Sequence, residues 1–456
     1  MKNTENCSVP RVLIAGTGSG CGKTTAVCAI LTALKNRGLN AGSFKCGPDY
    51  IDPMFHRRVT GTECSNLDLF FFDENTAKFF LAKRGAARDI SVIEGVMGFY
   101  DGMGMDDPKA SSYDVAKVTD TPAVLIVDAR GSALSVLATV HGFLDFYDDN
   151  TICGVILNRC TKHSYEALAE AMRKRFKGRV RPLGFMPSVP EAAIESRHLG
   201  LITAGEIKDL KEKMQMLGRR AEECIDIDGL IEISKAARPL SFDDISPAAF
   251  GESVKIAVAL DEAFCFYYDD SLDMLREMGA EITYFSPLSD KALPDGIQGI
   301  YIGGGYPELY LEKLSSNESM KESIRGALKA GMPCIAECGG FMYLTEEIDG
   351  YPVVGYIKGK CHNTGKLTRF GYVTLKARRD NMLCRAGEEI RGHEFHYYDC
   401  DNNGDSFTAV KQTGRTWECV VADDRLYAGF PHFSFYSNPA FAENFYKTCL
   451  EVKHSK

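Results

Sequence analysis

The feature of this sequence that most constrains its fold is a glycine-rich segment that follows a short apolar run near the N-terminus. The run RVLIAG, residues 11–16, is typical of a buried strand; it leads into GTGSGCGKTT, residues 16–25, and then into a helical pattern over 23–37. Glycines let the backbone curl so that several N–H groups converge on phosphate oxygens, and the start of the following helix adds partial positive charge. This order of strand, turn and helix predicts a phosphate-binding loop.

The residue types in this loop predict how it binds ATP. We expect the loop backbone at Gly20 and Gly22 and the first helical turn at Thr25 to hold phosphates, Lys23 to reach the β- and γ-phosphates, and Thr24 to hold Mg²⁺. Five residues lie between Gly16 and the Gly22-Lys23 pair, where the usual motif has four. The loop also lacks the early lysine of partitioning ATPases, which favours small-molecule phosphoryl chemistry over a motor.

Two further segments carry carboxylates at the ends of predicted strands. Asp49 lies in FKCGPDYIDP, residues 44–53, and Glu94 begins EGVMGFYDG, residues 94–102. Open α/β sheets bind ligands at the carboxyl ends of their parallel strands. Because Mg²⁺ commonly takes one or two carboxylates plus phosphate oxygens, we expect Thr24, Asp49 and Glu94 to form a magnesium site.

The wider sequence pattern predicts two α/β domains. Short β-rich runs alternate with amphipathic helical stretches from residue 11 to about 188, which is typical of a doubly wound parallel sheet. Residues 236–253 lack a clear apolar period and read as a linker. The alternation restarts at Val254 and becomes more β-rich after Tyr351. We therefore predict domains at 1–240 and 254–456.

Composition excludes several classes of protein. The chain has 45% hydrophobic and 25% charged residues and a net charge of −9, so we expect a globular protein that does not bind nucleic acid. The apolar runs are too short to span a bilayer and the N-terminus is polar, so we expect a cytoplasmic protein without membrane contact. For a chain of this kind with 16 cysteines and no CxxC pair, we expect neither a disulfide framework nor a zinc ribbon.

Cys338 stands apart from the other cysteines. It lies in AECGG, residues 336–340, between a predicted strand and a helical segment, which is the arrangement of a nucleophile elbow. The helix N-terminus is expected to lower the pKa of the thiol. The N–H groups of Gly339 and of Gly304, in the GGG of residues 303–305, are predicted to form an oxyanion hole.

A thiol nucleophile needs a base, and His432 in GFPHF is the best placed by sequence. His393 and His396, in RGHEFHYYD, are rivals. The position two after His432, where an orienting acid is expected, is Ser434. The sequence therefore predicts a Cys–His dyad without a third, acidic member.

An ATP site and a thiol hydrolase in one chain suggest a glutamine amidotransferase. The motifs GTGSGCGKTT, FKCGPDYIDPMFH, EGVMGFYDG, GGGYPE, AECGGFMYL and GHEFHYY occur in order over nearly the whole chain. This series resembles that of the cobyrinic acid a,c-diamide synthase family. The N-terminal part is similar to dethiobiotin synthetase, and the C-terminal part to class I glutamine amidotransferases of the cobyric acid synthase type, in which the acidic third member is missing.

The resemblance implies an ATP- and glutamine-dependent ligase for a corrinoid. Cys338 would be the nucleophile and His432 its base, while Tyr50 and Asp101 would lie on the corrinoid side of the synthetase site. Lys45 is implied, less specifically, to neutralise phosphate or substrate carboxylate. ATP would activate the c and then the a carboxylate as an acyl phosphate, which ammonia from glutamine attacks. A homodimer is a candidate assembly.

Two alternatives stay open at this point. The similar nickel-sirohydrochlorin a,c-diamide synthase differs in macrocycle and metal. A non-catalytic nucleotide switch belongs to a different class and needs no working elbow, so a glutaminase assay separates it from both enzymes.

Overall fold

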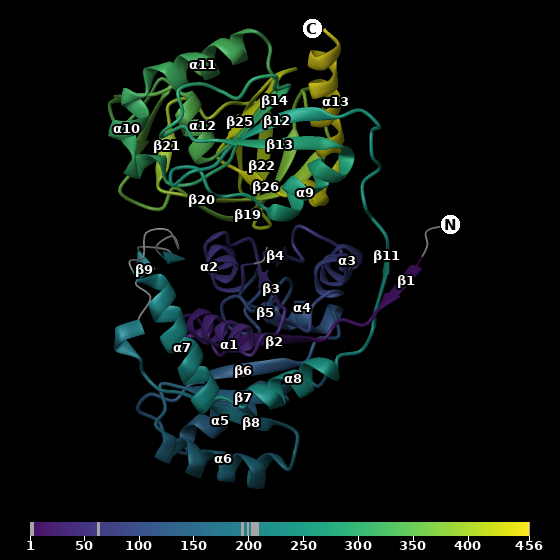
Figure 1. Ribbon diagram of the computed structural model, residues 1–456, viewed down its shortest axis with the longest axis vertical. Helices are drawn as coiled ribbons and strands as arrows, with labels where there is room; N and C mark the ends of the chain where they lie inside the picture. Colours follow the sequence, from purple (N-terminus) through teal and green to yellow (C-terminus); the bar gives the residue numbers. More distant parts are fainter. Residues whose placement is uncertain (1–3, 62–63, 193–195, 198–199, 202–208, 456) are drawn as a thin grey trace. The chain divides into compact units, whose positions relative to one another are not determined.

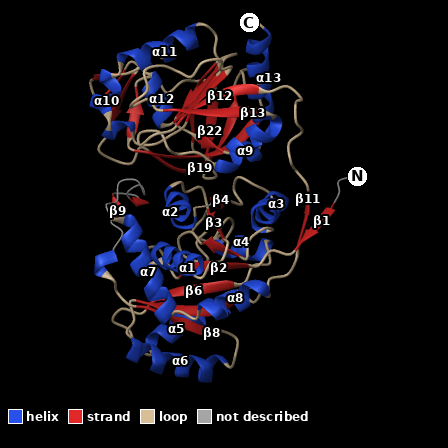
Figure 2. Cartoon of the chain, in the orientation of Figure 1, coloured by secondary structure: helices blue, strands red, loops and turns tan. Residues whose placement is uncertain are grey.

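The computed structural model describes residues 4–61, 64–192, 196–197, 200–201 and 209–455. The chain divides into two compact units, Met1–Ile245 and Ser246–Lys456 (Figure 1). Each unit has its own central sheet with surrounding helices (Figure 2). Both are α/β structures, and the doubly wound architecture expected for the N-terminal part is confirmed.

The first unit is built on a seven-stranded sheet in which every neighbouring pair is parallel. In spatial order its strands are β4 (Cys64–Leu67), β3 (Ala41–Cys46), β5 (Ile90–Glu94), β2 (Arg11–Gly16), β6 (Ala123–Asp128), β7 (Ile152–Asn158) and β8 (Arg181–Met186). Every residue of β2, β3 and β5 is buried, as expected for strands covered on both faces.

Among the described residues, eight α-helices of the first unit flank this sheet (Figure 1). They are α1 (Lys23–Asn36), α2 (Ile51–Thr60), α3 (Glu74–Gly85), α4 (Ser112–Val118), α5 (Ser135–Asp145), α6 (Lys162–Phe176), α7 (Leu210–Cys224) and α8 (Ile227–Lys235). Several begin at side-chain caps: Asp73 accepts a hydrogen bond from Thr76 N, and Thr161 from Ser164 N. Two short strands, β9 (Ser196–Arg197) and β10 (Gly200–Leu201), form a separate pair.

Part of the segment that the sequence predicted as a linker forms a strand. Residues of β11 (Leu240–Asp243) pair antiparallel with β1 (Thr4–Cys7), so the two ends of the first unit are joined in one ribbon. Leu240 and Phe242 of β11 are buried and alternate with exposed Ser241 and half-buried Asp243, so this segment has the period of two of a half-buried strand, which the linker prediction missed.

The second unit has a six-stranded sheet, parallel except for its last pair. In spatial order its strands are β13 (Ala280–Phe285), β12 (Val254–Ala259), β14 (Gly299–Ile302), β15 (Cys334–Glu337), β25 (Leu426–Gly429) and β24 (Val421–Ala422). Its helices are α9 (Asp269–Met278), α10 (Leu311–Ser316), α11 (Glu318–Lys329), α12 (Gly339–Leu344) and α13 (Pro439–His454).

Two smaller sheets account for the β-rich character expected after Tyr351. One contains β23 (Thr416–Cys419), β22 (Phe407–Val410), β19 (Arg369–Ala377), β20 (Glu389–His396) and β26 (His432–Phe433). The other contains β17 (Tyr351–Pro352), β16 (Glu347–Ile348), β18 (Lys360–Asn363) and β21 (Tyr398–Cys400).

Cys361 and Cys400 face each other across β18 and β21 and are joined in a disulfide. The sequence had predicted no disulfide framework, and this one pair departs from that expectation because strand register, which the sequence does not reveal, brings the two together. Most of the free cysteines are buried, as expected for small apolar side chains. Over the part of the chain that the structure describes, no helix combines the length and apolar character needed to cross a bilayer.

Candidate active sites

The phosphate loop follows β2 and ends at the first residue of α1. Gly22 is the N-cap of α1 with a φ of 94°, and a Cβ there would lie 2.1 Å from the Nδ2 atom of Asn158, so only glycine fits. The ammonium of Lys23 donates to the carbonyls of Gly18 (3.0 Å) and Met97 (2.5 Å) and is therefore held within the loop.

Two residues outside the phosphate loop, which were not predicted from the sequence, donate hydrogen bonds to its backbone carbonyls. Asn158, the last residue of β7, donates through Nδ2 to the carbonyl of Cys21 at 2.7 Å. Arg159 donates to the carbonyl of Gly20 at 3.1 Å. Their position at the carboxyl end of a parallel strand was the available signal, because that end of the sheet is where ligand sites form.

Thr24 lies in the first turn of α1 and contacts the end of β5. Its hydroxyl donates to Glu94 Oε1 at 2.7 Å and lies 3.4 Å from Asp52 Oδ1. Lys45, on β3, places its ammonium 2.5 Å from Asp52 Oδ2 and 3.0 Å from Glu94 Oε1. The structure therefore brings together Thr24 and Glu94, as predicted, and adds Asp52, which the sequence reasoning had not selected.

His56 also contacts this cluster: its Nε2 lies 2.6 Å from Glu94 Oε2. Burial acts to raise the pKa of Glu94, but Lys45, His56 and Thr24 outweigh it and hold that pKa below its usual range. Burial alone would lower the pKa of His56, but Cys64 and Glu94 raise it to about 10. Glu94 is therefore ionised and His56 is an imidazolium at neutral pH.

The remaining residues predicted for the synthetase site are Asp49, Tyr50 and Asp101. Asp49 accepts a hydrogen bond from Ile51 N at 2.8 Å, and its charge helps to raise the pKa of Lys45 against the larger opposing effect of burial. Tyr50 is buried at the N-terminus of α2. Asp101 is exposed in the loop after β5, where its carboxylate accepts from Gly98 N at 2.8 Å.

The cluster fits a magnesium ion that would be coordinated both by these side chains and by phosphate oxygens. The oxygens of Thr24, Asp52 and Glu94 converge, and oxygen donors of this kind are those that Mg²⁺ prefers. Among the described residues, no three His, Cys, Asp or Glu side chains gather into a complete metal cage. One or two carboxylates beside a phosphate loop are the usual protein contribution to an ATP-bound magnesium.

In the second unit, Cys338 occupies the sharp turn between β15 and α12. Its φ of 48° and ψ of −105° are strained for a residue with a side chain, as at a nucleophile elbow. Its backbone N–H donates to the carbonyl of Gly429 at 2.7 Å, which ties the turn to the neighbouring strand β25. Only 8% of Cys338 is exposed.

The expectation that the helix N-terminus lowers the pKa of Cys338 is wrong. Burial raises the pKa of this thiol well above its ordinary range, and the charges of Glu308, Glu337 and Glu394 add to the shift. The hydrogen bond from Gly339 opposes the shift, but α12 has only six residues. The resting thiol is therefore protonated, and its activation requires a base.

His432 adjoins Cys338 across Gly304. A Cβ built on Gly304 would lie 3.1 Å from His432 Nε2 and 3.5 Å from Cys338 Cβ, so both side chains border the same small space. Burial lowers the pKa of His432 to about 3, an effect to which His396 adds and which Glu394 opposes. The imidazole is therefore neutral and able to accept a proton.

The prediction of a dyad with no acidic neighbour is wrong. His432 Nδ1 lies 3.0 Å from Oε2 of Glu337, the residue directly before Cys338. An acid two positions after His432 was expected from sequence, but the acid that contacts it comes from β15, a strand of the six-stranded sheet, whereas His432 lies on β26 of the five-stranded sheet.

The predicted oxyanion-hole glycines lie close to this pair. The carbonyl of Gly304 accepts from Cys265 N and Phe266 N, which holds its peptide in place. A Cβ on Gly339 would lie 3.3 Å from the backbone nitrogen of Gly305. The two glycine turns thus approach each other beside Cys338, and their role as N–H donors remains a prediction.

The rival histidines have other contacts. His393 pairs with His432 in the register of β20 and β26, stacks on its ring at 5.2 Å, and lies 3.2 Å from the hydroxyl of Tyr268 through Nδ1. His396 stacks on Phe430 at 4.0 Å. These contacts favour His432 as the base.

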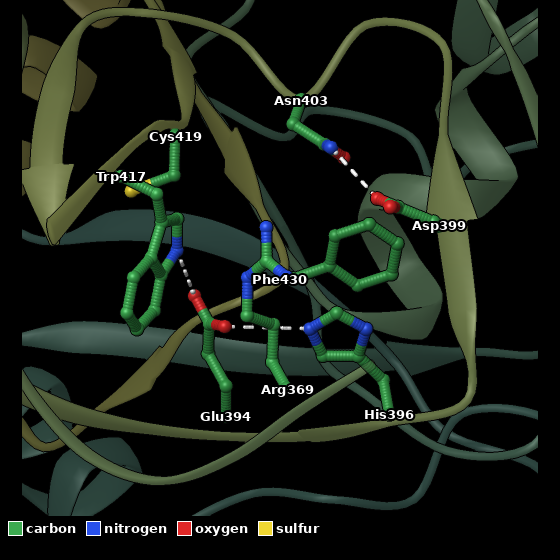
Figure 3. Close-up of a pocket in the computed structure, with 8 residues that line it drawn as sticks. All are labelled: Arg369, Glu394, His396, Asp399, Asn403, Trp417, Cys419 and Phe430. Carbon is green, nitrogen blue, oxygen red and sulfur yellow. Dashed lines mark hydrogen bonds and ion pairs between the residues drawn. The ribbon is translucent and has the colours of Figure 1, made fainter. Parts of the chain in front are cut away.

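Figure 3 shows a small polar pocket of the second unit. One of its lining residues, Phe430, directly follows Gly429, whose carbonyl accepts from Cys338 N. Glu394 accepts from Trp417 Nε1 at 3.3 Å and lies 3.4 Å from His396 Nε2, while the Arg369 guanidinium lies 5.0 Å from the centre of the Trp417 ring. Glu394 acts on the pKa of both Cys338 and His432, after the larger effect of burial. The other lining residues are Asp399, Asn403, Cys419 and Phe430.

Comparison with known proteins identifies both units. Residues 12–201 match the family model described as the CobQ/CobB/MinD/ParA nucleotide binding domain. Residues 255–440 match the CobB/CobQ-like glutamine amidotransferase domain.

Relatives match over nearly the full length of the chain. The cobyrinate a,c-diamide synthase of Thermoplasma volcanium is 40% identical, with 98% of each chain covered. Those of Listeria monocytogenes (strain F2365) and Priestia megaterium are 40% and 35% identical, covering 94% and 98% of this chain and 97% and 98% of their own. The chain belongs to the cobyrinate a,c-diamide synthase family of glutamine-hydrolysing ligases.

Proposed function

We propose that the chain transfers the amide nitrogen of glutamine to the a and c side-chain carboxylates of cobyrinic acid or hydrogenobyrinic acid at the expense of ATP. The observation that carries this proposal is that one chain contains both kinds of site: a thiol–imidazole site in the second unit, and a phosphate loop with carboxylates in the first. The names of the full-length relatives supply the substrate. We assign the synthetase role to residues 1–240 and the glutaminase role to residues 254–456.

In the glutaminase half, the Cys338 thiol gives its proton to His432 Nε2 as the sulfur attacks the carboxamide carbon of glutamine. The developing oxyanion is stabilised by the N–H groups of Gly339 and Gly304. The imidazolium then protonates the departing nitrogen, and ammonia leaves behind a thioester. Water, deprotonated by His432, hydrolyses the thioester to glutamate and restores the thiol.

The polar residues of the pocket in Figure 3 match the charged end of glutamine in chemistry, and the pocket, with a volume of about 10 Å³, must widen to admit that end. A free amino acid carries one carboxylate and one ammonium, and the pocket offers the guanidinium of Arg369 and the carboxylates of Glu394 and Asp399. Guanidinium groups bind carboxylates with paired hydrogen bonds. We assign Arg369 to the α-carboxylate and Glu394 to the α-ammonium of glutamine.

In the synthetase half, a substrate carboxylate oxygen attacks the γ-phosphorus of ATP and forms an acyl phosphate and ADP. Ammonia then attacks the acyl carbon, and phosphate leaves. Lys23 and the loop N–H groups orient the phosphates, while Thr24, Asp52 and Glu94 would hold Mg²⁺, with Asp49 nearby. When bound, Mg²⁺ neutralises phosphate charge during in-line transfer. Tyr50 and Asp101 are assigned to the corrinoid.

The chain has a single phosphate loop, so the two amidations are expected to occur in sequence. Each carboxylate needs its own phosphate leaving group, and the macrocycle must release or reorient between the two reactions. A mass-spectrometric time course with ATP, Mg²⁺ and glutamine should show a monoamide that rises early and decays into the a,c-diamide, with two phosphates released per diamide. One phosphate per diamide would contradict this proposal, and turnover of nickel-sirohydrochlorin without turnover of any corrinoid would assign a different macrocycle.

A further inference from the structure

Glu337 is the last residue of β15, and both of its carboxylate oxygens are held by neighbouring elements. Oε1 accepts a hydrogen bond from the hydroxyl of Tyr301, on β14, at 2.9 Å. Oε2 lies 3.0 Å from Nδ1 of His432, on β26. Glu337 is 1% exposed. Burial disfavours the charged form of a carboxylate, so such a position is costly unless polar partners compensate for it.

The contact with Glu337 distinguishes the two ring nitrogens of His432. Nδ1 is directed at the carboxylate, whereas Nε2 lies on the side of Gly304, where it borders the same space as the Cβ atom of Cys338. An ionised carboxylate can only accept, so it places the proton of a neutral imidazole on Nδ1 and leaves Nε2 as the basic nitrogen. This is the tautomer that can take the thiol proton.

Other charged and titratable groups surround this pair. Those facing Glu337 besides His432 and Tyr301 are Tyr267, Cys338 and Tyr427, and those facing His432 from β20 are His393, Glu394 and His396. A positive charge on His393 or His396 would repel, and so destabilise, an imidazolium at His432. Glu337 and Glu394 are the acidic groups in this set, and Glu394 also belongs to the polar pocket.

We infer that Glu337 is the positioning residue of the glutaminase site: it fixes the proton of His432 on Nδ1 and stabilises the imidazolium that forms when the Cys338 thiol loses its proton. In this step the S–H bond breaks, an N–H bond forms at Nε2, and Glu337 stays ionised throughout. The inference rests on the proposed glutaminase function and deepens it.

Burial gives this arrangement a pH dependence. Burial raises the pKa of Glu337 to about 8, although the hydrogen bond from Tyr301 opposes the shift. A protonated Glu337 would donate to Nδ1 and leave the proton of His432 on Nε2, which is the inactive tautomer. Glutaminase activity should therefore rise with pH as Glu337 ionises, and the apparent pKa belongs to the coupled Glu337–His432 pair.

The principal test compares Glu337→Gln with wild type in glutamine hydrolysis. We expect kcat to fall by as much as about 10⁴-fold, the loss caused when the orienting aspartate of a Ser-His-Asp triad is replaced by asparagine, with little change in KM. The rising limb of the pH profile near pH 8 should disappear. Glu337→Asp should recover part of kcat and the rising limb. Glu389→Gln, at an exposed glutamate of β20 that pairs with Lys376, is the matched control and should behave as wild type.

A second variant tests the same geometry without removing the carboxylate. Tyr301→Phe deletes the donor to Oε1, which favours the protonated form of Glu337, so the rising limb should move to higher pH. An unmoved limb in Tyr301→Phe, or a Glu337→Gln variant with wild-type kcat and an unchanged profile, would overturn the inference.

A third measurement needs no variant to be active. In wild-type protein labelled with ¹⁵N-histidine, the signal of His432 can be assigned by its loss in His432→Ala. Above pH 9 it should report protonation at Nδ1; protonation at Nε2 would refute the role of Glu337. If wild type itself hydrolyses no glutamine, the proposed function fails, whereas active wild type with an unaffected Glu337→Gln variant rejects the present inference alone.

Discussion

The hydroxyl of Thr24 donates to the carboxylate of Glu94 across 2.7 Å, which joins the first turn of α1 to the end of β5. The contact brings a phosphate-loop residue and a carboxylate to the same point of the sheet edge. Lys45 and Asp52 complete the cluster. The proposed magnesium site can therefore be tested one oxygen donor at a time.

Replacing Glu94 or Asp52 by its amide should abolish ATP-dependent amidation with either glutamine or ammonia as nitrogen source. The loss of one charge that stabilises the transition state costs about 3–4 kcal/mol, or roughly 10²–10³-fold in rate. Steady-state phosphate release measures the effect, and glutamine hydrolysis by the same variants is the control. Asp49→Asn separates the two aspartates: a smaller loss than in Asp52→Asn is expected because Asp52 is the one that contacts Thr24.

Cys338→Ala should lose glutamine-dependent amidation while keeping amidation driven by added ammonium salts. The thiol is needed only to release ammonia, and the phosphate loop belongs to the other unit. Product formation with each nitrogen source is the measurement. Loss of both activities in a folded Cys338→Ala protein would contradict the two-site mechanism.

His432→Ala and His396→Ala should differ sharply. We expect the His432 variant to lose at least about 10²-fold in glutaminase kcat, the lower range for a missing general base. The His396 variant should retain more activity, because its ring stacks on Phe430 in the polar pocket and contacts Glu394. The reverse order of defects in a glutaminase assay would reassign the base.

Arg369→Ala should raise the KM for glutamine more than it lowers kcat. Removing one charged partner from a substrate commonly costs about 1.5–3 kcal/mol, or roughly 10–150-fold. Arg369→Lys keeps the charge but loses the planar guanidinium, so an intermediate KM is expected. A KM within twofold of wild type in Arg369→Ala would remove this residue from the glutamine site.

The His56–Glu94 pair should make the stability of the first unit depend on pH. The pKa of His56 rises to about 10 on folding from an ordinary value near 6.5. Its contribution is therefore fully present below about pH 6.5 and is lost as the pH rises through 10. Urea unfolding followed from pH 6.5 to 10.5 should show a decline in wild type that is reduced in His56→Gln. Equal slopes for the two proteins would show that the pair does not link stability to pH.

The fold was largely predictable from local sequence. The strand β2 spans residues 11–16, the same residues as the run RVLIAG that predicted it, because strands buried on both faces are mainly apolar. The helix α1 begins at Lys23 as the phosphate-loop motif requires. By contrast, β4 with the sequence CSNL has no apolar pattern, and its place beside β3 came only from the structure.

The sequence by itself determined the chemistry-bearing turns: the phosphate loop at Lys23 and Thr24 and the elbow at Cys338. Each is encoded by contiguous residues whose small size and backbone conformation leave few alternatives. Only the tertiary structure decided their partners. Asp52 reaches Thr24 from another helix, and Glu337 reaches His432 across 95 positions of sequence. Burial likewise reversed the expected shift of the Cys338 pKa. Distances between side chains on different strands, and the water they exclude, depend on sheet order and packing, which no local pattern encodes.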